Sequence, residues 1–387
     1  SQGVYALINL FSGGALLQLS IFAIGVMPYI TASIIVQLLT VVIPRFEELK
    51  KEGQSGQAKM DQYTRYLTLA LALLQSSGIV ALADREQLLG QGTRVLKEGR
   101  TLFDLIILVL VMSAGAVLVM WLGEIITERG VGNGMSLLIF AGIATRIPAD
   151  GVNILHGSGG LVFSLVLVAV IVLVVGVVFV EQGQRRIPVQ YAKRMVGRRQ
   201  YGGSSTYLPL KVNQGGVIPV IFASSLIYMP VLITQIVNSG SPTPPDNWWQ
   251  RNVIQYLQTP SSWQYIVLYF VLIIFFSYFY VSVQYDPAEQ AENMKKYGGF
   301  IPGIRPGRPT AEYLGYVMNR LLFVGALYLG VIAILPNIML DFGVAARSGS
   351  STPFGGTAIL IMVSVALTTV KQIESQLLQS NYEGLLK

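Results

Sequence analysis

The stretch LVFSLVLVAVIVLVVGVVFV, at residues 161–180, contains no charged side chain and no proline. A helix of about 20 apolar residues, rising 1.5 Å per residue, crosses a bilayer hydrocarbon core about 30 Å thick. The whole chain shares this character, because 52% of its 387 residues are hydrophobic and only 12% are charged. Soluble domains carry about 25% charged residues. The sequence therefore indicates a protein that lies largely within a membrane.

Apolar runs of similar character recur along the chain and predict further membrane-spanning helices. The nine predicted spans are 20–44, 67–83, 102–122, 135–147, 161–180, 212–237, 265–285, 321–335 and 355–370. The first span contains Pro28, which removes a helical hydrogen bond, so we expect a kink there. The sequence GVGNG at Gly130–Gly134 lacks the Lys-Ser/Thr of a phosphate-binding loop and predicts a tight turn.

The basic residues are distributed unequally over the connections between these spans. Most of the 27 Lys and Arg residues fall in alternating segments, namely 45–66, 123–134, 181–211, 286–320 and 371–387. Cytoplasmic loops of multi-span membrane proteins carry the excess of basic residues. We therefore expect these segments and the C-terminus to be cytoplasmic, and the residues before 20 to lie on the opposite side.

The titratable residues argue against several functional classes. The chain has no cysteine and one histidine, His156, so thiolate chemistry and His-based metal or triad sites are not expected. We expect no catalytic residue, no metal and no cofactor. Ion-coupled carriers usually need a charged group at mid-membrane. The acids nearest to the spans are at span ends, namely Asp104, Glu124, Asp286 and Glu374. A secondary transporter with inverted repeats is the alternative interpretation.

Two of the expected cytoplasmic loops, 181–211 and 286–320, are longer than ordinary connections. The first is strongly basic and contains a single acid, Glu181. Both mix arginine and aromatic residues with the glycine and proline that set turn conformations. Basic segments beside a membrane commonly touch anionic lipid headgroups. The length and the turn residues favour a docking surface for an acidic or phosphate-rich partner, such as ribosomal RNA.

Several long strings resemble the SecY family, the channel subunits of the bacterial-type Sec protein translocon. They include FSGGALLQLSIFAIGVMPYITASIIVQLLTVV (Phe11–Val42), WLGEIITERGVGNGMSLLIF (Trp121–Phe140), QRRIPVQYAKRMVGRR (Gln184–Arg199), LPLKVNQGGVIPVIFASS (Leu208–Ser225) and GGFIPGIRPG (Gly298–Gly307). The resemblance runs essentially end to end. It implies an all-α fold, a polytopic membrane helix bundle whose two inverted-topology halves form an hourglass channel. The family has ten spans, so the resemblance also implies that the family's first transmembrane helix is absent from this sequence.

The resemblance divides the chain into four segments. Residues 1–19 would form a plug-like extracytoplasmic segment, and 20–147 an N-terminal half with four helices. Residues 148–160 would form an outer hinge loop. Residues 161–387 would form a C-terminal half with five helices, which carries the long cytoplasmic loops 181–211 and 286–320.

The resemblance also assigns roles to individual residues. A ring of apolar side chains would close the pore, formed by Val26, Ile30, Met135, Ile139, Ile221 and Ile361. The first two pairs have i, i+4 spacing, so each pair would share one helix face. The plug would contain Leu7, Phe11, Gly13 and Gly14. Polar contacts across a lateral gate would involve Gln37, Gln75 and Asn213, for which ordinary helix–helix hydrogen bonding is an equally good interpretation.

The implied function is the passage of unfolded preproteins across the membrane, with sideways release of transmembrane segments into lipid. The residues that resemble the docking site for the SecA motor ATPase or the ribosome are Arg198, Arg199, Arg305, Pro306 and Gly307. Further implied partners are small SecE-like and SecG-like membrane subunits, the nascent or unfolded preprotein, and anionic lipids. The implied location is the bacterial cytoplasmic (inner) membrane, where the chain would serve secretion.

Overall fold

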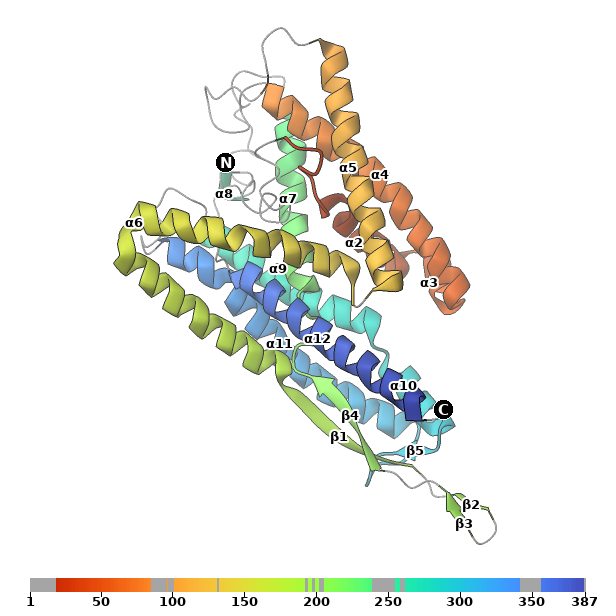
Figure 1. Cartoon of the computed structure of the whole chain (residues 1–387). Helices are drawn as coiled ribbons and strands as arrows, with labels where there is room; N and C mark the ends of the chain where they lie inside the picture. Colours follow the sequence, from red (N-terminus) through yellow and green to blue (C-terminus); the bar gives the residue numbers. More distant parts are fainter. Residues whose placement is uncertain are drawn as a thin grey trace.

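The computed structural model describes residues 19–84, 96, 101–130, 132–191, 194–196, 199–201, 205–238, 255–257, 262–341 and 356–385. The helices are α2 (Met27–Val42), α3 (Pro44–Lys51), α4 (Gln54–Asp84), α5 (Leu102–Arg129), α6 (Gly134–Gln182), α7 (Ile218–Asn238), α8 (Gln255–Leu257), α9 (Trp263–Gln284), α10 (Pro287–Lys296), α11 (Arg308–Asp341) and α12 (Gly356–Leu385). The strands are β1 (Gln184–Tyr191), β2 (Arg194–Val196), β3 (Arg199–Tyr201), β4 (Ser205–Lys211) and β5 (Gly299–Phe300). The helices form the body of the molecule, and the strands project from one end of it (Figure 1).

Each predicted span overlaps a helix, which confirms the predicted helical membrane bundle. Within the described residues, 5 helices are long and apolar enough to cross a membrane: Leu102–Arg129, Phe163–Gln182, Trp263–Lys296, Arg308–Leu335 and Thr357–Leu378. Two shorter apolar helices, Gly134–Pro148 and Ile218–Val231, overlap the predicted spans 135–147 and 212–237. The helix α4, which overlaps the predicted span 67–83, is not in the first group.

The predicted kink at Pro28 is wrong, because the helix begins at this point. The helix α2 starts at Met27 with Val26 as its N-cap, so Pro28 lies in the first turn. The missing N–H of a proline has no consequence there, because first-turn amides have no intrahelical partner. The chain bends instead at Pro44, where α2 and α3 meet at 104°.

The segment 148–160 is helical in the structure, in contrast to the expected loop. The helix α6 continues through Pro148 and is interrupted only at Gly159, whose φ of 83° lies in the left-handed region. Glycine adopts this conformation without the steric clash that a Cβ would cause. Figure 1 shows α6 as two rods joined at a sharp reversal. The two predicted spans on either side are therefore joined by a tight helical turn.

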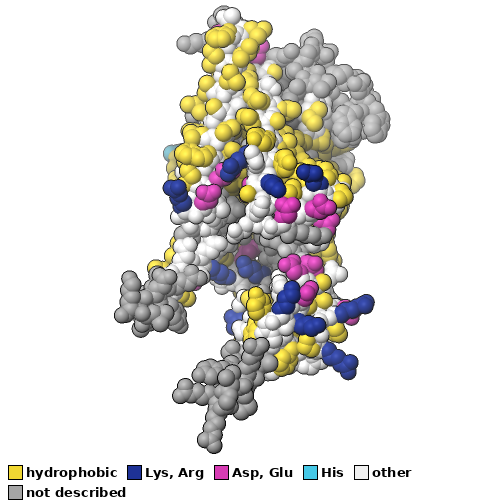
Figure 2. Space-filling model, turned by 90° about the vertical axis from the view of Figure 1, so that its right-hand side faces the viewer, with side chains coloured by type: hydrophobic (Ala, Val, Ile, Leu, Met, Phe, Trp, Pro, Cys, Tyr) yellow, Lys and Arg dark blue, Asp and Glu magenta, His cyan; other side chains and the backbone are white. Residues whose placement is uncertain are grey.

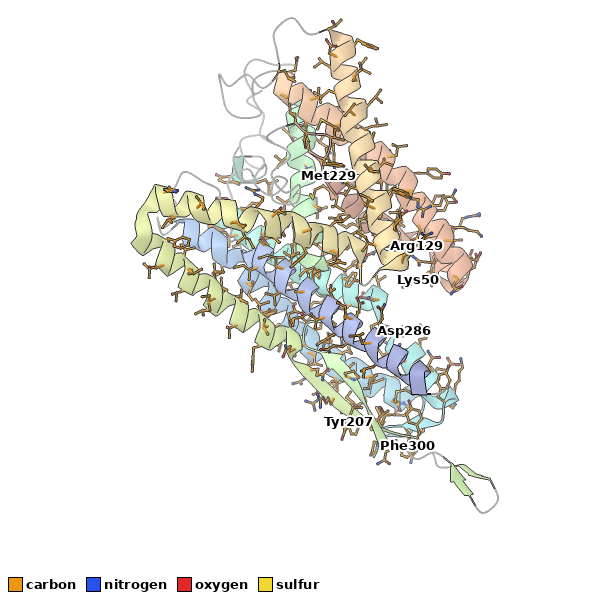
Figure 3. All side chains as sticks on the ribbon, in the orientation of Figure 1. Lys50, Arg129, Tyr207, Met229, Asp286 and Phe300 are labelled. Atoms are coloured by element: carbon orange, nitrogen blue, oxygen red, sulfur yellow. The ribbon has the colours of Figure 1, made fainter. Side chains whose placement is uncertain are left out.

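The two long predicted loops contain a small sheet with the order β4-β1-β5. The strands β1 and β4 form an antiparallel hairpin, and β5 pairs with the other edge of β1 through Gln190 and Phe300. Tyr207 on β4 and Phe300 on β5 are labelled in Figure 3. On β1, Ile187 and Val189 are buried and alternate with exposed residues. This alternation, visible in RIPVQY, is typical of a half-buried strand and could have predicted the hairpin from the sequence.

The helices enclose one large apolar core, and a second, smaller core lies under the sheet. The larger core draws buried residues from α2, α4, α5, α6, α7, α9, α11 and α12. The smaller core includes Ile187 and Leu210 from the hairpin and Leu314 and Met318 from α11. The helix α7 contacts α2, α4, α9 and α11. On the face drawn in Figure 2, hydrophobic side chains cover most of the upper part, and charged side chains gather lower down.

Candidate channel waist and lateral gate

The six residues expected to form the pore ring are all buried in the larger core. None is more than 8% exposed, and all belong to one continuous apolar cluster. They come from four separate segments: α2 with its N-cap, α6, α7 and α12. All six residues therefore belong to the larger apolar core, and we call this set of six residues the waist.

The turn before α2 places Val26 and Ile30. Gly25 has a φ of 58°, and its amide donates to the carbonyl of Phe22 at 2.9 Å. The amide of Ile30 then donates to the carbonyl of Val26 at 3.1 Å, which places these two residues on one helix face. Gly115 of α5 lies so close to the carbonyl of Ile21 that a Cβ would collide with it. This contact holds the turn against α5.

A capped helix start places Met135 and Ile139. The Asn133 side chain accepts hydrogen bonds from the amides of Met135 at 3.1 Å and Ser136 at 3.2 Å, as an N-cap residue does. A Cβ on Gly134 would collide with the carbonyl oxygen of Gly123 on α5. The glycines of GVGNG therefore serve a turn and a close helix contact, in agreement with the predicted tight turn.

The other two waist residues lie near the starts of α7 and α12. The amide of Ile221 donates to the carbonyl of Val217 at 3.2 Å. Val217 directly follows Gly216, which has a φ of 58°. Ile361 is 1% exposed and follows three residues of α12 that are equally buried, Ala358–Leu360.

Two buried hydroxyls close in sequence to waist residues bond to carbonyls of their own helices. The Thr31 hydroxyl donates to the carbonyl of Met27 at 3.0 Å, and the Ser224 hydroxyl donates to that of Val220 at 2.8 Å. Serine and threonine commonly bond to the carbonyl four residues earlier in this way. These two hydroxyls are therefore satisfied, whereas the buried Ser225 hydroxyl on α7 has no hydrogen-bond partner among the described residues.

The helix α7, one side of the expected lateral gate, contacts α2, α4 and α9. The Gln75 side chain on α4 is 1% exposed, and its Nε2 has no hydrogen-bond partner among the described residues. Gln37 on α2 is half-buried. Asn213 donates to Glu181 Oε1 at 2.6 Å and to the Gly216 carbonyl at 3.1 Å. In the described part of the chain, no hydrogen bond joins these three side chains to one another.

Aromatic contacts between α7 and α9 were not anticipated from the sequence. The hydroxyls of Ser224 and Tyr269 are 3.0 Å apart, and the ring of Phe222 meets that of Phe276 edge-on with centroids 5.7 Å apart. The apolar runs contain many aromatic residues, and period and spacing do not indicate which of them meet.

The predicted docking loop has a defined conformation. Arg305 and Pro306 are exposed. The carbonyl of Arg305 accepts a hydrogen bond from the buried Thr310 hydroxyl at 2.8 Å. Gly303 and Gly307 have φ values of 84° and 101°, a region that favours glycine. The loop therefore holds Arg305 outward at a turn.

Several predicted site residues lie outside the described part of the chain. These are Leu7, Phe11, Gly13, Gly14 and Arg198. Arg199 is the first residue of β3, which pairs with β2 at the far end of the β1–β4 hairpin. Figure 1 shows this end of the hairpin extending away from the helices.

Two contacts at the charged end of the bundle were also missed. Arg65 on α4 donates to Glu124 Oε1 on α5 at 2.8 Å, and this hydrogen bond raises the pKa of the Arg65 guanidinium. Lys50 on α3 donates to the carbonyl of Val283 on α9 at 2.6 Å. The sequence places Arg65 and Glu124 near the same side of the membrane, which was the available signal for the first contact.

The described residues contain no group of three or more His, Cys, Asp or Glu side chains that could hold a metal ion. The Thr31 hydroxyl is held by its own helix, and the Arg65–Glu124 contact lies at the charged end of the bundle.

These features define a class of protein: a multi-span α-helical membrane protein with a large buried apolar core. The family model SecY matches residues 20–370, so the chain belongs to the SecY family. The chain is 86% identical over 386 residues to the protein translocase subunit SecY of Corynebacterium glutamicum, and the match covers 100% of this chain and 88% of that protein.

Two solved structures share the fold at low sequence identity. One is described as "The structure of a protein conducting channel"; it has a TM-score of 0.66, is 20% identical, and the match covers 96% of this chain and 90% of that chain. The other is described as "Sec61 in the Canine ribosome-channel complex from the endoplasmic reticulum"; it has a TM-score of 0.61, is 19% identical, and the match covers 91% of this chain and 81% of that chain.

Proposed function

We propose that this chain is the protein-conducting channel of a Sec translocon, which passes unfolded preproteins across the membrane and releases transmembrane segments sideways into lipid. The observation that carries the proposal is that Val26, Ile139, Ile221 and Ile361, from separate segments of the chain, are buried in the same apolar core. Membership of the SecY family, with a relative named protein translocase subunit SecY, supports the same conclusion.

An apolar waist suits a channel that must transmit polypeptide and retain ions. A narrow hydrophobic constriction loses its water when empty, and this raises the barrier to ions. Aliphatic side chains make no hydrogen bonds to a passing chain, so they bind no particular sequence. In this proposal the ring yields around the polypeptide, and the plug residues Leu7–Gly14 move away on the opposite side of the membrane.

We further propose that α7 forms the mobile side of a lateral gate, because it contacts α2 and α4. Opening there would let a segment in the channel sample lipid. Each central Leu, Ile, Phe or Val gains about 0.3–0.6 kcal/mol on insertion, so about 20 such residues gain roughly 6–12 kcal/mol. A charged segment would lose energy and continue through the waist. Sorting is then a partition equilibrium that requires no catalytic residue.

The charged end of the bundle is the proposed docking side and faces the cytoplasm. The sheet β4-β1-β5 connects the two long loops, and Arg305 lies exposed at a turn between Gly303 and Gly307. Arginine forms bidentate contacts with carboxylates and phosphates, which suits both a motor ATPase such as SecA and ribosomal RNA. The similarity to a ribosome-bound channel supports the second partner. We also expect small SecE-like and SecG-like subunits, anionic lipid contacts and a bacterial cytoplasmic membrane location.

The test is a transport assay with the full complex reconstituted in lipid vesicles. With SecA and ATP, we expect protease-protected accumulation of an unfolded preprotein and no concentration of a small solute such as lactose or an amino acid. Solute accumulation driven by an ion gradient would favour the secondary transporter. Failure to protect the preprotein, with correctly inserted complex, would contradict the channel proposal.

A further inference from the structure

A groove on the outer surface of the bundle lies between α9 and α11. It has a volume of about 560 Å³ and is lined by Tyr278 from α9 and by Tyr316, Asn319, Arg320, Phe323 and Val324 from α11. The α11 residues recur at intervals of three and four, so they form one helix face. The waist residues lie in the larger core, and none of them lines this groove, so the groove is separate from the proposed channel.

The charge pattern of α11 leads us to expect the groove at the level where lipid headgroups meet the hydrocarbon core. Residues 321–340 carry no charge, which makes Arg320 the last charged residue before the apolar part of α11. On α9, the side chain of Tyr278 packs against the smaller core, which also contains Met318 and Leu322. Arg320 is therefore at the end of the span that lies nearer the sheet, as expected for an interfacial arginine.

The arginine head is held in place and carries a charge that is not neutralised. The Arg320 guanidinium carbon lies 4.9 Å from the centroid of the Tyr316 ring, within the range of a cation–π interaction. In the described part of the chain, no carboxylate forms an ion pair with Arg320. A fixed guanidinium with free donors is suited to a phosphate group.

The rest of the groove changes from polar to apolar along α11. Asn319 adds an amide next to Arg320, and one turn further Phe323 and Val324 are 57% and 56% exposed. This order matches a glycerophospholipid, whose phosphate precedes its acyl chains. We propose that the groove binds one anionic phospholipid, with the phosphate on Arg320 and an acyl chain along Phe323 and Val324. The site depends on α11 lying in a membrane, and it does not depend on channel activity.

The test uses a local fluorescent probe in the full complex. The chain has no cysteine, so Val324→Cys introduces a single thiol in this chain for a fluorophore at the edge of the groove. The complex is reconstituted in vesicles that contain brominated phosphatidylglycerol or brominated phosphatidylcholine at equal mole fraction. We expect brominated phosphatidylglycerol to quench the fluorophore roughly fivefold more strongly than brominated phosphatidylcholine does. This ratio corresponds to the attraction of about 1 kcal/mol between one basic residue and an anionic lipid surface.

Two variants separate this site from general surface charge. Arg320→Gln should reduce the preference to about one, whereas Arg308→Gln, on the same helix and paired with Glu312, should leave it unchanged. If the Arg320→Gln variant does not assemble, Tyr316→Leu provides the test. This variant keeps the charge of Arg320 and removes the aromatic ring that holds the guanidinium. The preference for phosphatidylglycerol should then fall at least twofold.

Three results would overturn the proposal. An equal preference in the parent and in the Arg320→Gln variant would mean that the arginine does not select lipid. Loss of the preference on adding water-soluble glycerol phosphate would mean that the site takes a free phosphate. A fluorophore that neither brominated lipid quenches would mean that a protein subunit covers the groove.

Discussion

Lys50 Nζ donates a hydrogen bond to the carbonyl oxygen of Val283 at 2.6 Å, although the two residues are 233 positions apart. Lys50 lies near the end of α3, and Val283 is one of the last residues of α9, whose terminal carbonyls have no partner within the helix. Lysine at a helix C-terminus satisfies such carbonyls and opposes the negative end of the helix dipole. Lys50 and Asp286, both labelled in Figure 3, lie near this junction, which joins the two halves of the chain.

This contact predicts that Lys50→Met loosens the junction between α3 and α9. A cation at a helix C-terminus contributes about 0.3–1 kcal/mol, so the equilibrium should shift roughly two- to fivefold toward separation. Spin labels attached after Glu48→Cys and Ala288→Cys report the distance, because the chain has no other thiol. We expect the distance distribution of the Lys50→Met variant to gain a population at longer distances between the two spin labels. The control Lys59→Met removes a contact to Glu52 within the first half, and it should leave the distribution unchanged.

The waist predicts an ion leak when it becomes polar. Ile139→Asn should raise the ion conductance of reconstituted vesicles, because an amide retains water in the constriction. Ile139→Val should keep the seal. Ile143 on the same helix is 1% exposed and lies outside the proposed ring, so Ile143→Asn is the matched control for burial of a polar group. Equal leaks from Ile139→Asn and Ile143→Asn would show that the ring has no special role.

The docking loop predicts a loss of transport without a loss of folding. Arg305→Glu reverses the charge of an exposed side chain and leaves the hydrogen bond from Thr310 to its backbone carbonyl in place. We expect SecA-driven preprotein transport to be abolished while size-exclusion profile and membrane insertion stay unchanged. Arg308→Gln, in the first turn of α11, should transport normally. Normal transport by Arg305→Glu would remove this residue from the docking site.

The close contact between α5 and α6 predicts a strong effect of one methyl group. Gly134→Ala would place a Cβ against the carbonyl oxygen of Gly123, which is backbone and cannot rotate away. We expect destabilisation of about 1–3 kcal/mol, measured as a lower melting temperature in detergent. Gly176→Ala, also on α6, meets nothing within 4 Å and should be neutral or slightly stabilising. Similar melting temperatures for both variants would contradict the tight crossing.

The burial of the six waist residues could not be derived from composition or periodicity. Each is one apolar residue among many in its span, and an apolar side chain faces lipid or protein equally well. Ile139 and Ile171 illustrate this, because both lie in α6, yet the first is 2% and the second 54% exposed. Only the resemblance to a family singled out Ile139, and only the tertiary structure shows its neighbours.

The sequence by itself determined that this protein is a bundle of membrane-spanning helices with a charged end. The physical reason is local: an apolar run of sufficient length must satisfy its backbone hydrogen bonds within a helix once it is in lipid. The tertiary structure decided where α2 begins, how α6 turns at Gly159, how the sheet joins the two long loops, and that Lys50 meets Val283. These features depend on contacts between segments distant in the chain, and no local pattern of residues encodes which segments meet.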